Sequence, residues 1–292
     1  MRFQLRYTPT SVSIIPAQRL VKEGLSLLQL QTVMQPIDFP RLYESQYESF
    51  AADLPLWHRL AGLYPGPVLE LGCGPGRVLA ALAESGLDVS GLDHDRAMLS
   101  RARACLERRG VPSVPLYQAD MRSFHLSRMF GLILAPCNTS AVLDDRGLGQ
   151  MLTCVRAHLS PNGAFAAEMP NPFDTEVPDP HEPLQVFIDR ESANPVQVYA
   201  SQQMQEDPPR AQVTWSYDEL QPDGHVVRAQ VHTSFHLRRP EAVGRLLQAS
   251  GFAAWHFHGD YDSATFVPDS PRLIVVAESS GNQDTQENPG CD

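Results

Sequence analysis

The sequence is poor in the features that build disulfide, metal or membrane-bound frameworks. Five cysteines occur in 292 residues, and no two of them form a Cys-x-x-Cys pair, so neither a disulfide framework nor a zinc site is expected. His, Asp and Glu show no metal-ligand spacing, and no metal is expected. No apolar run is long enough to cross a bilayer, and the N-terminal segment lacks a signal peptide's apolar core and cleavage site. We therefore expect a reduced, cytoplasmic protein without membrane contact.

Positive charge is also scarce. The chain has 23 Lys and Arg against 34 Asp and Glu, a formal net charge of -11 at pH 7. Because an acidic surface repels the phosphate backbone, a nucleic-acid partner is not expected. Hydrophobic residues make up 42% of the chain, which is enough for one α/β core with an appendage. The expected partner is a small molecule, and the sequence leaves the oligomeric state open.

A glycine-rich turn stands between an apolar strand pattern and a helical pattern. Glu70 follows the strand residues Val68-Leu69, and Gly72, Gly74 and Gly76 come next. Glycines there permit positive φ and let a ligand approach the main chain. The third glycine comes one residue earlier than in Gly-x-Gly-x-x-Gly, which disfavours a dinucleotide with its pyrophosphate. Glu70 beside the turn favours a ligand with a positive centre over an anion.

The next apolar stretch ends in Asp93, which places a carboxylate where a ribose diol would lie. A ligand with a ribose, a positive centre and no phosphate fits S-adenosylmethionine. Residues 70–76, followed by Gly91-Leu92-Asp93, resemble the first two motifs of the class I, Rossmann-like S-adenosylmethionine-dependent methyltransferases. The resemblance covers residues 41–278. It is specific at 68–76 and modest elsewhere.

The resemblance implies an α/β fold with a seven-stranded mixed sheet flanked by helices. Alternating apolar residues between 184 and 237 predict three or four antiparallel strands, and in this family an insertion at that place covers the acceptor pocket. Whether residues before Met34 belong to the native protein is left open. The expected division is a poorly ordered extension over 1–36, a cofactor-binding core over 37–170, an antiparallel insertion over 171–237, the last helix and closing strands over 238–279, and a disordered tail over 280–292.

The resemblance also assigns residues to the cofactor. Asp120 and Met121 match the element that reads adenine, and His94 would lie near the same ring; for Asp120 a plain turn is the alternative. Tyr43 lies in a stretch with helical spacing, 41–61, and resembles a tyrosine that closes over the cofactor, although packing of that helix onto the sheet explains it equally well. The full expected set is Tyr43, Glu70, Gly72, Gly74, Gly76, Asp93, His94, Asp120, Met121 and Cys137.

The loop after the apolar run 130–136 is expected to line the site of methyl transfer. It lacks the Asp/Asn-Pro-Pro-Tyr motif that methyltransferases of nucleobases and glutamine carry there, which argues against those acceptors. Asn138 either orients the acceptor or makes a turn, and both readings stay open. The candidates for a general base are His236, Tyr261 and Glu168, with none preferred.

The sequence is therefore interpreted as a methyltransferase that acts on a nitrogen or oxygen of a small-molecule acceptor, with amines slightly favoured by the resemblance. An NAD-dependent oxidoreductase is one alternative, disfavoured by the glycine spacing and by the lack of a second substrate domain. A non-catalytic protein that binds S-adenosylmethionine is the other.

Overall fold

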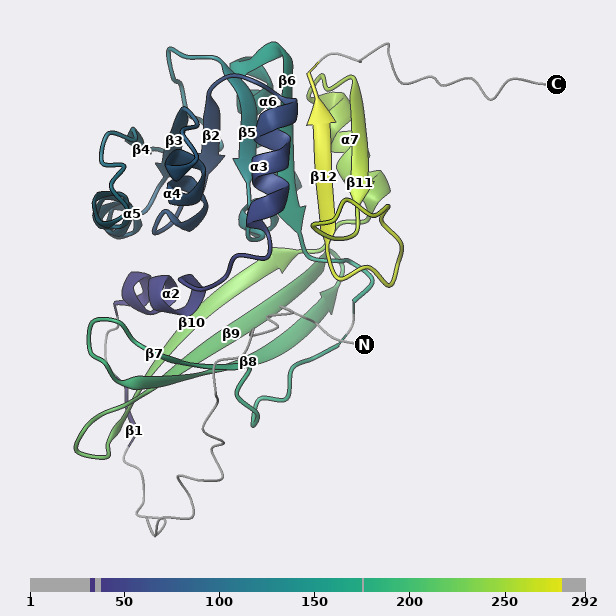
Figure 1. The fold of residues 1–292 in the computed structure, drawn as a ribbon. Helices are drawn as coiled ribbons and strands as arrows, with labels where there is room; N and C mark the ends of the chain where they lie inside the picture. Colours follow the sequence, from purple (N-terminus) through teal and green to yellow (C-terminus); the bar gives the residue numbers. More distant parts are fainter. Residues whose placement is uncertain (1–31, 35–37, 175, 280–292) are drawn as a thin grey trace, which may run out of the picture.

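A computed structural model describes residues 32–34, 38–174 and 176–279. Two sheets make up the fold (Figure 1). The parallel strands of the larger, seven-stranded sheet point their carboxyl ends toward the smaller sheet, which lies across that edge (Figure 1). The predicted extension, apart from 32–34, and the predicted tail lie outside the described residues.

The larger sheet has the order β11-β12-β6-β5-β2-β3-β4. Strands β2 to β6 run parallel, and β12 and β11 add an antiparallel hairpin. The bounds are β2 (Val68–Leu71), β3 (Val89–Asp93), β4 (Leu116–Gln118), β5 (Phe130–Ala135), β6 (Leu159–Met169), β11 (Ala254–His258) and β12 (Leu273–Glu278). The expected seven-stranded mixed sheet is confirmed. From β2 the chain continues to β3 and β4 on one side and then crosses to β5 and β6 on the other side. The reversal of strand order therefore lies between β2 and β5, and open α/β sheets bind their ligands at such a point.

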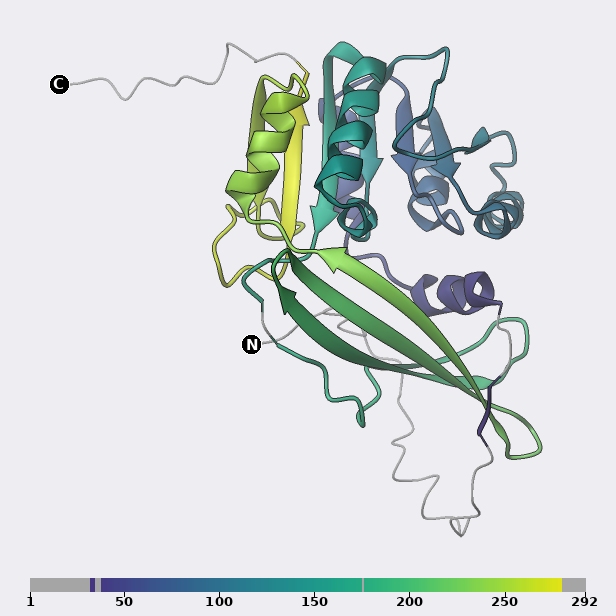
Figure 2. The same ribbon diagram turned by 180° about the vertical axis from the view of Figure 1, so that it is seen from behind.

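Helices cover both faces of this sheet, as the view from behind in Figure 2 makes plain. On one face α3 (Leu54–Leu63), α4 (Arg77–Glu84) and α5 (Arg96–Arg108) bury an apolar cluster that includes Trp57. On the other face α6 (Asp145–His158) and α7 (Pro240–Ala249) bury a second cluster that includes Leu247. None of the helices within the described ranges combines the length and apolar character that a bilayer span needs.

The smaller sheet has the order β1-β10-β9-β8-β7. Its four antiparallel strands confirm the predicted antiparallel β insertion, and β1 pairs parallel with β10. The strand β1 lies within the segment that the sequence analysis assigned to an extension. The bounds are β1 (Thr32–Met34), β7 (Gln185–Ile188), β8 (Pro195–Glu206), β9 (Pro209–Leu220) and β10 (Val226–His236).

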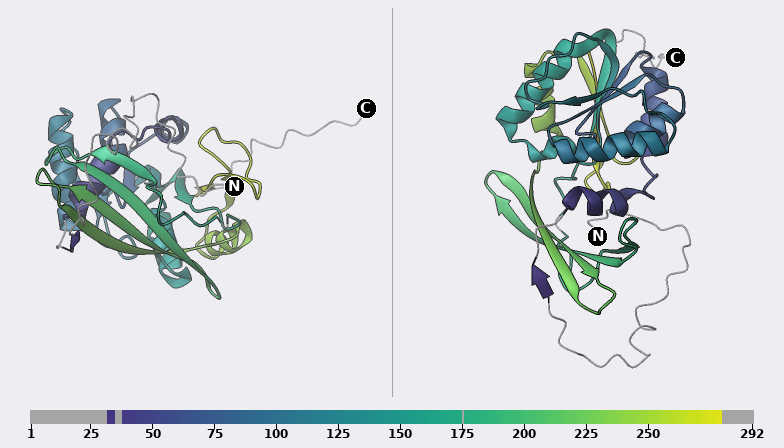
Figure 3. Two further views of the ribbon diagram at one scale, coloured as in Figure 1. Left: turned by 90° about the horizontal axis from the view of Figure 1, so that it is seen from below. Right: turned by 90° about the vertical axis from the view of Figure 1, so that its left-hand side faces the viewer.

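The helix α2 (Phe39–Tyr47) lies between the two sheets (Figure 3). The helical spacing predicted over 41–61 is in fact broken into α2 and α3, because Pro55 sits in the first turn of α3 and starts a new helix there. The break lets α2 leave the α/β layer. Its Leu42 packs against Val198 and Tyr217 of the smaller sheet, so α2 roofs the carboxyl ends of the parallel strands.

Candidate functional site

The glycine turn after β2 is built on backbone that other residues rarely adopt. Gly72, Gly74 and Gly76 have φ values of 61°, 52° and 87°, the left-handed region that glycine occupies without strain. A Cβ on Gly72 would stand 2.4 Å from Cγ2 of Thr139. At Gly74 the nearest atom to such a Cβ is Cε1 of Tyr43, 4.0 Å away. The backbone at Gly74 therefore faces open space under the tyrosine.

Asp93, at the end of β3, is fixed against this turn. Its Oδ2 accepts the N–H of Gly74 at 2.9 Å, and its Oδ1 accepts the N–H of Asp95 at 2.9 Å. Each carboxylate oxygen retains a further acceptor position. The neighbouring His94 has 85% of its side chain exposed, on the solvent side of the carboxylate. Asp93 itself is 7% exposed and is not among the residues that line the cavity described next.

A cavity opens between α2, the glycine turn and the loop after β5. The space it encloses, counted together with its opening to solvent, is about 770 Å3. The predicted cofactor residues in its wall are Tyr43, Glu70, Gly72, Gly74 and Cys137. These residues come from three separate segments of the chain: α2, β2 with the turn after it, and the loop after β5.

Glu70 is the buried acid of this wall. It is 4% exposed, and its Oε2 has no hydrogen-bond partner among the described residues. Burial raises the pKa of Glu70 to about 8, against the opposing charge of Arg77 and with help from Asp53 and Asp93. The carboxyl is therefore largely neutral at pH 7, and a cation placed beside it would favour the ionised form.

Arg77 is a residue of this wall that the sequence analysis missed. Its Nη1 and Nη2 donate to the two carboxylate oxygens of the fully buried Asp53, each at 2.7 Å. Nη2 also lies 3.2 Å from Sγ of Cys137. A signal was present, because Arg77 is the first residue of α4, where the helix dipole disfavours a cation. A cation there indicates a partner outside the helix.

The loop after β5 adopts a strained conformation. Cys137 and Asn138 have φ values of 53° and 60°, and such angles in two successive non-glycine residues are uncommon and cost energy. The N–H of Cys137 donates to Oε2 of Glu168 at 3.2 Å, while Arg77 holds the thiol side. Burial raises the pKa of Cys137 to about 12, so this residue stays a thiol at pH 7.

Asn138, in the same loop, has an unused acceptor, although Asn138 is not among the residues that line the cavity. Its Oδ1 is buried and has no donor within the part of the chain that the structure describes. A buried amide oxygen without a donor carries a desolvation cost of about 1–3 kcal/mol. Asn138 precedes the short helix η1 (Thr139–Val142) as its N-cap and has a left-handed backbone conformation. Its backbone therefore makes the turn that the sequence analysis considered, and this turn does not use the side-chain oxygen.

Glu168, near the end of β6, is hydrogen-bonded to Tyr261, so two of the three predicted base candidates lie together. Tyr261 donates its hydroxyl to Oε1 of Glu168 at 3.0 Å, and Nη1 of Arg272 donates to the same oxygen at 3.1 Å. Burial raises the pKa of Glu168, and the charge of Arg272 opposes that shift. With Cys137 on Oε2, both oxygens are occupied. This arrangement holds the loop after β5 rather than leaving a carboxylate free.

His236 lies apart from this group. It ends β10 and is absent from the cavity wall. Burial and the charges of Arg238 and Arg210 lower its pKa. The structure thus brings Glu168 and Tyr261 together and leaves His236 elsewhere; any role in catalysis for the three stays a prediction.

The residues predicted to read adenine also lie outside the cavity wall. Asp120 accepts from Nε of Arg122 at 3.0 Å and from its backbone N–H at 2.8 Å, and these bonds lower the pKa of Asp120 to about 2. Its backbone contact is the one that a plain turn residue makes. Met121 is half-buried beside it. Contact of either residue with adenine stays a prediction.

Two further residues of the wall were not predicted as binding residues. Tyr47 lies one helical turn after Tyr43 on α2, and the two rings pack at a tilt of 42° with their centroids 4.6 Å apart. Thr139 fills the space beside Gly72. The sequence could have indicated Tyr47, because it is a second aromatic residue on the same helix face as Tyr43. No local sequence pattern indicates Thr139.

Residues 68–163 match the family model of the methyltransferase domain. A dTDP-3-amino-3,4,6-trideoxy-alpha-D-glucopyranose N,N-dimethyltransferase of Streptomyces venezuelae is 29% identical over 102 residues, which is 35% of this chain and 41% of that protein. The chain therefore matches about two fifths of the length of this relative.

Two solved structures share the fold over most of the chain. An S-adenosylmethionine-dependent methyltransferase from Clostridium acetobutylicum ATCC 824 superposes with a TM-score of 0.69 at 16% identity, covering 83% of this chain and 98% of that one. The sugar N-methyltransferase KedS8 from Streptoalloteichus sp. ATCC 53650 gives a TM-score of 0.66 at 20% identity, covering 88% and 99%. At these identities the likeness establishes the fold.

Proposed function

We propose that this chain, whose residues 68–163 match the methyltransferase-domain model and whose fold is that of an S-adenosylmethionine-dependent methyltransferase of known structure, transfers a methyl group from S-adenosylmethionine to a small-molecule acceptor. The observation that carries this proposal is the cavity under α2. Its wall combines the open backbone at Gly74 with a buried carboxyl, Glu70, whose Oε2 lacks a partner among the described residues.

These groups fit the parts of the cofactor. Glu70 would hold the ammonium group of the methionine portion, because a buried carboxyl with an unused oxygen gains most from a nearby cation. Asp93 would hold the ribose diol through its remaining acceptor positions. Tyr43 and Tyr47 would close over the ligand from α2. Asp120, Met121 and His94 are proposed for the adenine end.

Bound there, S-adenosylmethionine would supply a methyl group already activated by a positive sulfur. The residues of this chain would then work chiefly by alignment and exclusion of water, which together supply roughly 7–11 kcal/mol when geometry is good. The loop of Cys137 and Asn138 would set the position of the acceptor beside the cavity. Transfer forms the bond from methyl carbon to acceptor, breaks the bond from methyl carbon to sulfur, and releases the acceptor proton.

An amine is the acceptor that Asn138 favours. Its Oδ1, unpaired within the described residues, can accept an N–H and orient the nitrogen lone pair toward the methyl group. The names of the relatives, an amino-sugar N,N-dimethyltransferase and a sugar N-methyltransferase, support a sugar amine as the acceptor class. Neither Glu168 nor Tyr261 needs to be ionised for transfer to a neutral amine. A cytoplasmic location stays a prediction.

Ligand binding tests the cofactor first. Calorimetry should give binding of S-adenosylhomocysteine and none of NAD; the reverse result would favour the oxidoreductase. Gly74→Val should abolish binding, because valine at a φ of 52° is strained and fills the cavity. Gly86→Val is the matched control, since Gly86 has a φ of 79° and open space around it, away from the cavity wall. Equal affinities for both variants would contradict the proposed site.

Turnover tests the chemistry. Labelled cofactor with a panel of amino sugars, their hydroxyl analogues and a metabolite extract should give label transfer to an amine. Asn138→Ala should reduce turnover while the affinity for S-adenosylhomocysteine stays unchanged. Binding without transfer to any acceptor would favour the non-catalytic alternative.

A further inference from the structure

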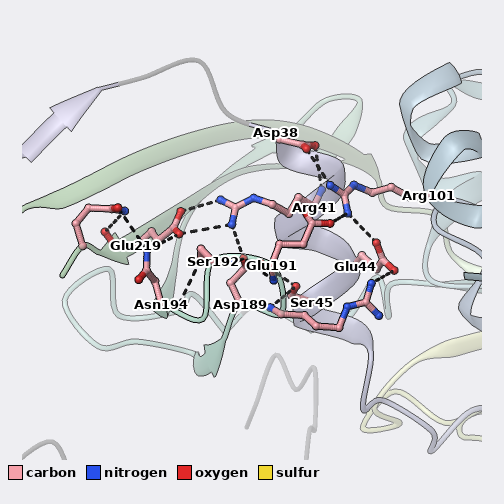
Figure 4. Close-up of polar contacts among 12 residues, drawn as sticks. Asp38, Arg41, Glu44, Ser45, Arg101, Asp189, Glu191, Ser192, Asn194 and Glu219 are labelled. Carbon is pink, nitrogen blue, oxygen red and sulfur yellow. Dashed lines mark hydrogen bonds and ion pairs between the residues drawn. The ribbon is translucent and has the colours of Figure 1, made fainter. Parts of the chain in front are cut away.

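The helix α2 has three distinct sides. Tyr43 and Tyr47 face the cavity, and Leu42 is buried against the smaller sheet. A third, polar side carries Arg41 and Ser45, which lie one turn apart on the helix. This polar side meets the turn between β7 and β8 of the insertion (Figure 4).

Asp189 is the centre of that meeting. It is fully buried, and its carboxylate accepts from the guanidinium of Arg41, from Oγ of Ser45 at 2.8 Å and from Oγ of Ser192 at 2.9 Å. Nη2 of Arg41 also donates to Glu219 on β9 at 2.7 Å. Burial alone would raise the pKa of Asp189, but bonds from Ser192 and Ser45 and the charge of Arg41 outweigh it and lower the pKa. The buried group is therefore an ionised carboxylate.

Glu44 makes a second attachment on the same helix. It is 8% exposed and accepts from Arg101 at 2.9 Å and Arg108 at 2.6 Å, both on α5. Arg190, next to Asp189 in the insertion, donates to it at 3.1 Å. Since one carboxylate binds α5 and the insertion together, α2 is held between them by charge as well as by its apolar side.

Buried ion pairs fix geometry more than they add stability, because removing one partner leaves an uncompensated charge that disfavours every other arrangement. The tyrosines that roof the cavity sit on the helix that Asp189 anchors. From this geometry we propose that Asp189, through Arg41 and Ser45, is a positioning residue for the cofactor: the insertion sets α2 over the cavity and thereby controls cofactor affinity, in addition to any contact with the acceptor.

The proposal rests on the proposed function only in taking S-adenosylhomocysteine as its probe. The full-length chain is titrated with that compound by calorimetry, without acceptor. Asp189→Asn and Arg41→Gln should each weaken binding about five-fold or more, in the range usual for coupled sites. Ser45→Ala removes one donor without disturbing any charge and should weaken binding less.

Asp218→Asn is the matched control. Asp218 makes a bidentate pair with Arg228 at 2.6 and 2.5 Å within the same insertion sheet. It leaves the Asp189 contacts to α2 intact, so its affinity should equal that of the wild type. Circular dichroism of each variant verifies the fold, and if Asp189→Asn does not fold, Arg41→Gln and Ser45→Ala decide the matter.

The outcomes separate this proposal from the proposed function. If the wild type binds S-adenosylhomocysteine and the folded variants at Arg41, Ser45 and Asp189 bind it equally well, the positioning role is overturned while the function stands. If these variants raise only the acceptor KM, the insertion acts on the acceptor alone, and the proposal again fails. If the wild type binds nothing, the proposed function itself is refuted.

Discussion

Cγ2 of Thr139 lies 2.4 Å from the position that a Cβ atom would take on Gly72. The glycine belongs to the turn after β2, and the threonine to the loop after β5. Their contact locks the turn that faces the cavity to the loop that would present the acceptor. The two halves of the proposed site therefore have one fixed spacing.

Gly72→Ala should destabilise the protein and weaken cofactor binding. The substitution forces a side chain into a φ of 61° and against Thr139, and overpacking of this kind costs about 1–3 kcal/mol. Gly149→Ala is the control, because Gly149 lies within α6 and has nothing within 4 Å of its Cβ position; it should stabilise by about 0.5–1 kcal/mol. Urea denaturation measures both. A Gly72→Ala protein as stable as the wild type would contradict the locked arrangement.

Glu70 should make cofactor binding depend on pH. Its pKa of about 8 in the folded protein keeps the carboxyl largely protonated at pH 7, whereas an ammonium ligand favours the ionised form. Binding should therefore release a proton, and the affinity for S-adenosylhomocysteine should rise between pH 6 and about 8. Calorimetry in buffers of different ionisation enthalpy counts the proton. Glu70→Gln should remove both the release and the pH dependence.

The same group should shape the stability of the ligand-free protein. Its pKa is raised from 4.5 to about 8 on folding, so between these values the folded state holds a proton that the unfolded state has lost. The contribution of Glu70 to stability therefore falls as pH rises through this window and levels off above it. Denaturation of Glu70→Gln across the window should lack that fall; an identical slope in both proteins would refute the assignment.

Arg77→Met should be severe. It leaves the carboxylate of Asp53 buried without its bidentate partner, and breaking a buried pair costs about 3–5 kcal/mol. Arg109→Met is the comparison, since the pair of Arg109 with Glu84 is largely exposed and contributes little. Chemical denaturation should separate the two variants clearly, and similar midpoints would argue against a structural role for Arg77.

Glu168→Gln should lower kcat and leave the affinity for S-adenosylhomocysteine unchanged. The glutamine amide cannot accept on both sides, so the bond from the N–H of Cys137 or those from Tyr261 and Arg272 must weaken. The loop that carries Asn138 would then lose its fixed position. Glu278→Gln, which alters a similar bond from Tyr64 at 2.8 Å, is the control.

The pH profile of kcat adds a second readout for Glu168. A retained profile with a lower plateau fits a residue that positions the loop. If kcat of the variant no longer increased with pH, Glu168 would instead be identified as the general base, which would contradict the positioning role. Tyr261→Phe should also lower kcat, but by less than Glu168→Gln does.

The parts of the fold that the sequence predicted are those with local causes. Three glycines require positive φ within five residues, and an apolar run such as 130–136 requires burial on both faces. The break between α2 and α3 escaped because the apolar spacing continues across it, although Pro55 was a local warning.

The polar contacts of the site were not predicted from the sequence for a different reason. Arg41 and Asp189 are 148 residues apart in the chain, and periodicity carries no information about such pairs. The position of Arg77 at the start of α4 indicates a partner outside the helix, but only the tertiary structure identifies that partner as Asp53. Sequence patterns located the turn that lines the cavity, whereas the side chains that hold α2 over it became apparent only in the tertiary structure.

The placement of α2 has a consequence for synthesis on the ribosome. The helix emerges before the first strand of the large sheet, but its anchor, Asp189, and its apolar support on β8 and β9 emerge only after Met169 ends β6. A nascent chain that ends at Met169 contains the glycine turn, but it lacks the residues that hold α2 over the cavity. If α2 closes over the cofactor as proposed, the chain can hold that cofactor under α2 only after the insertion has been synthesised.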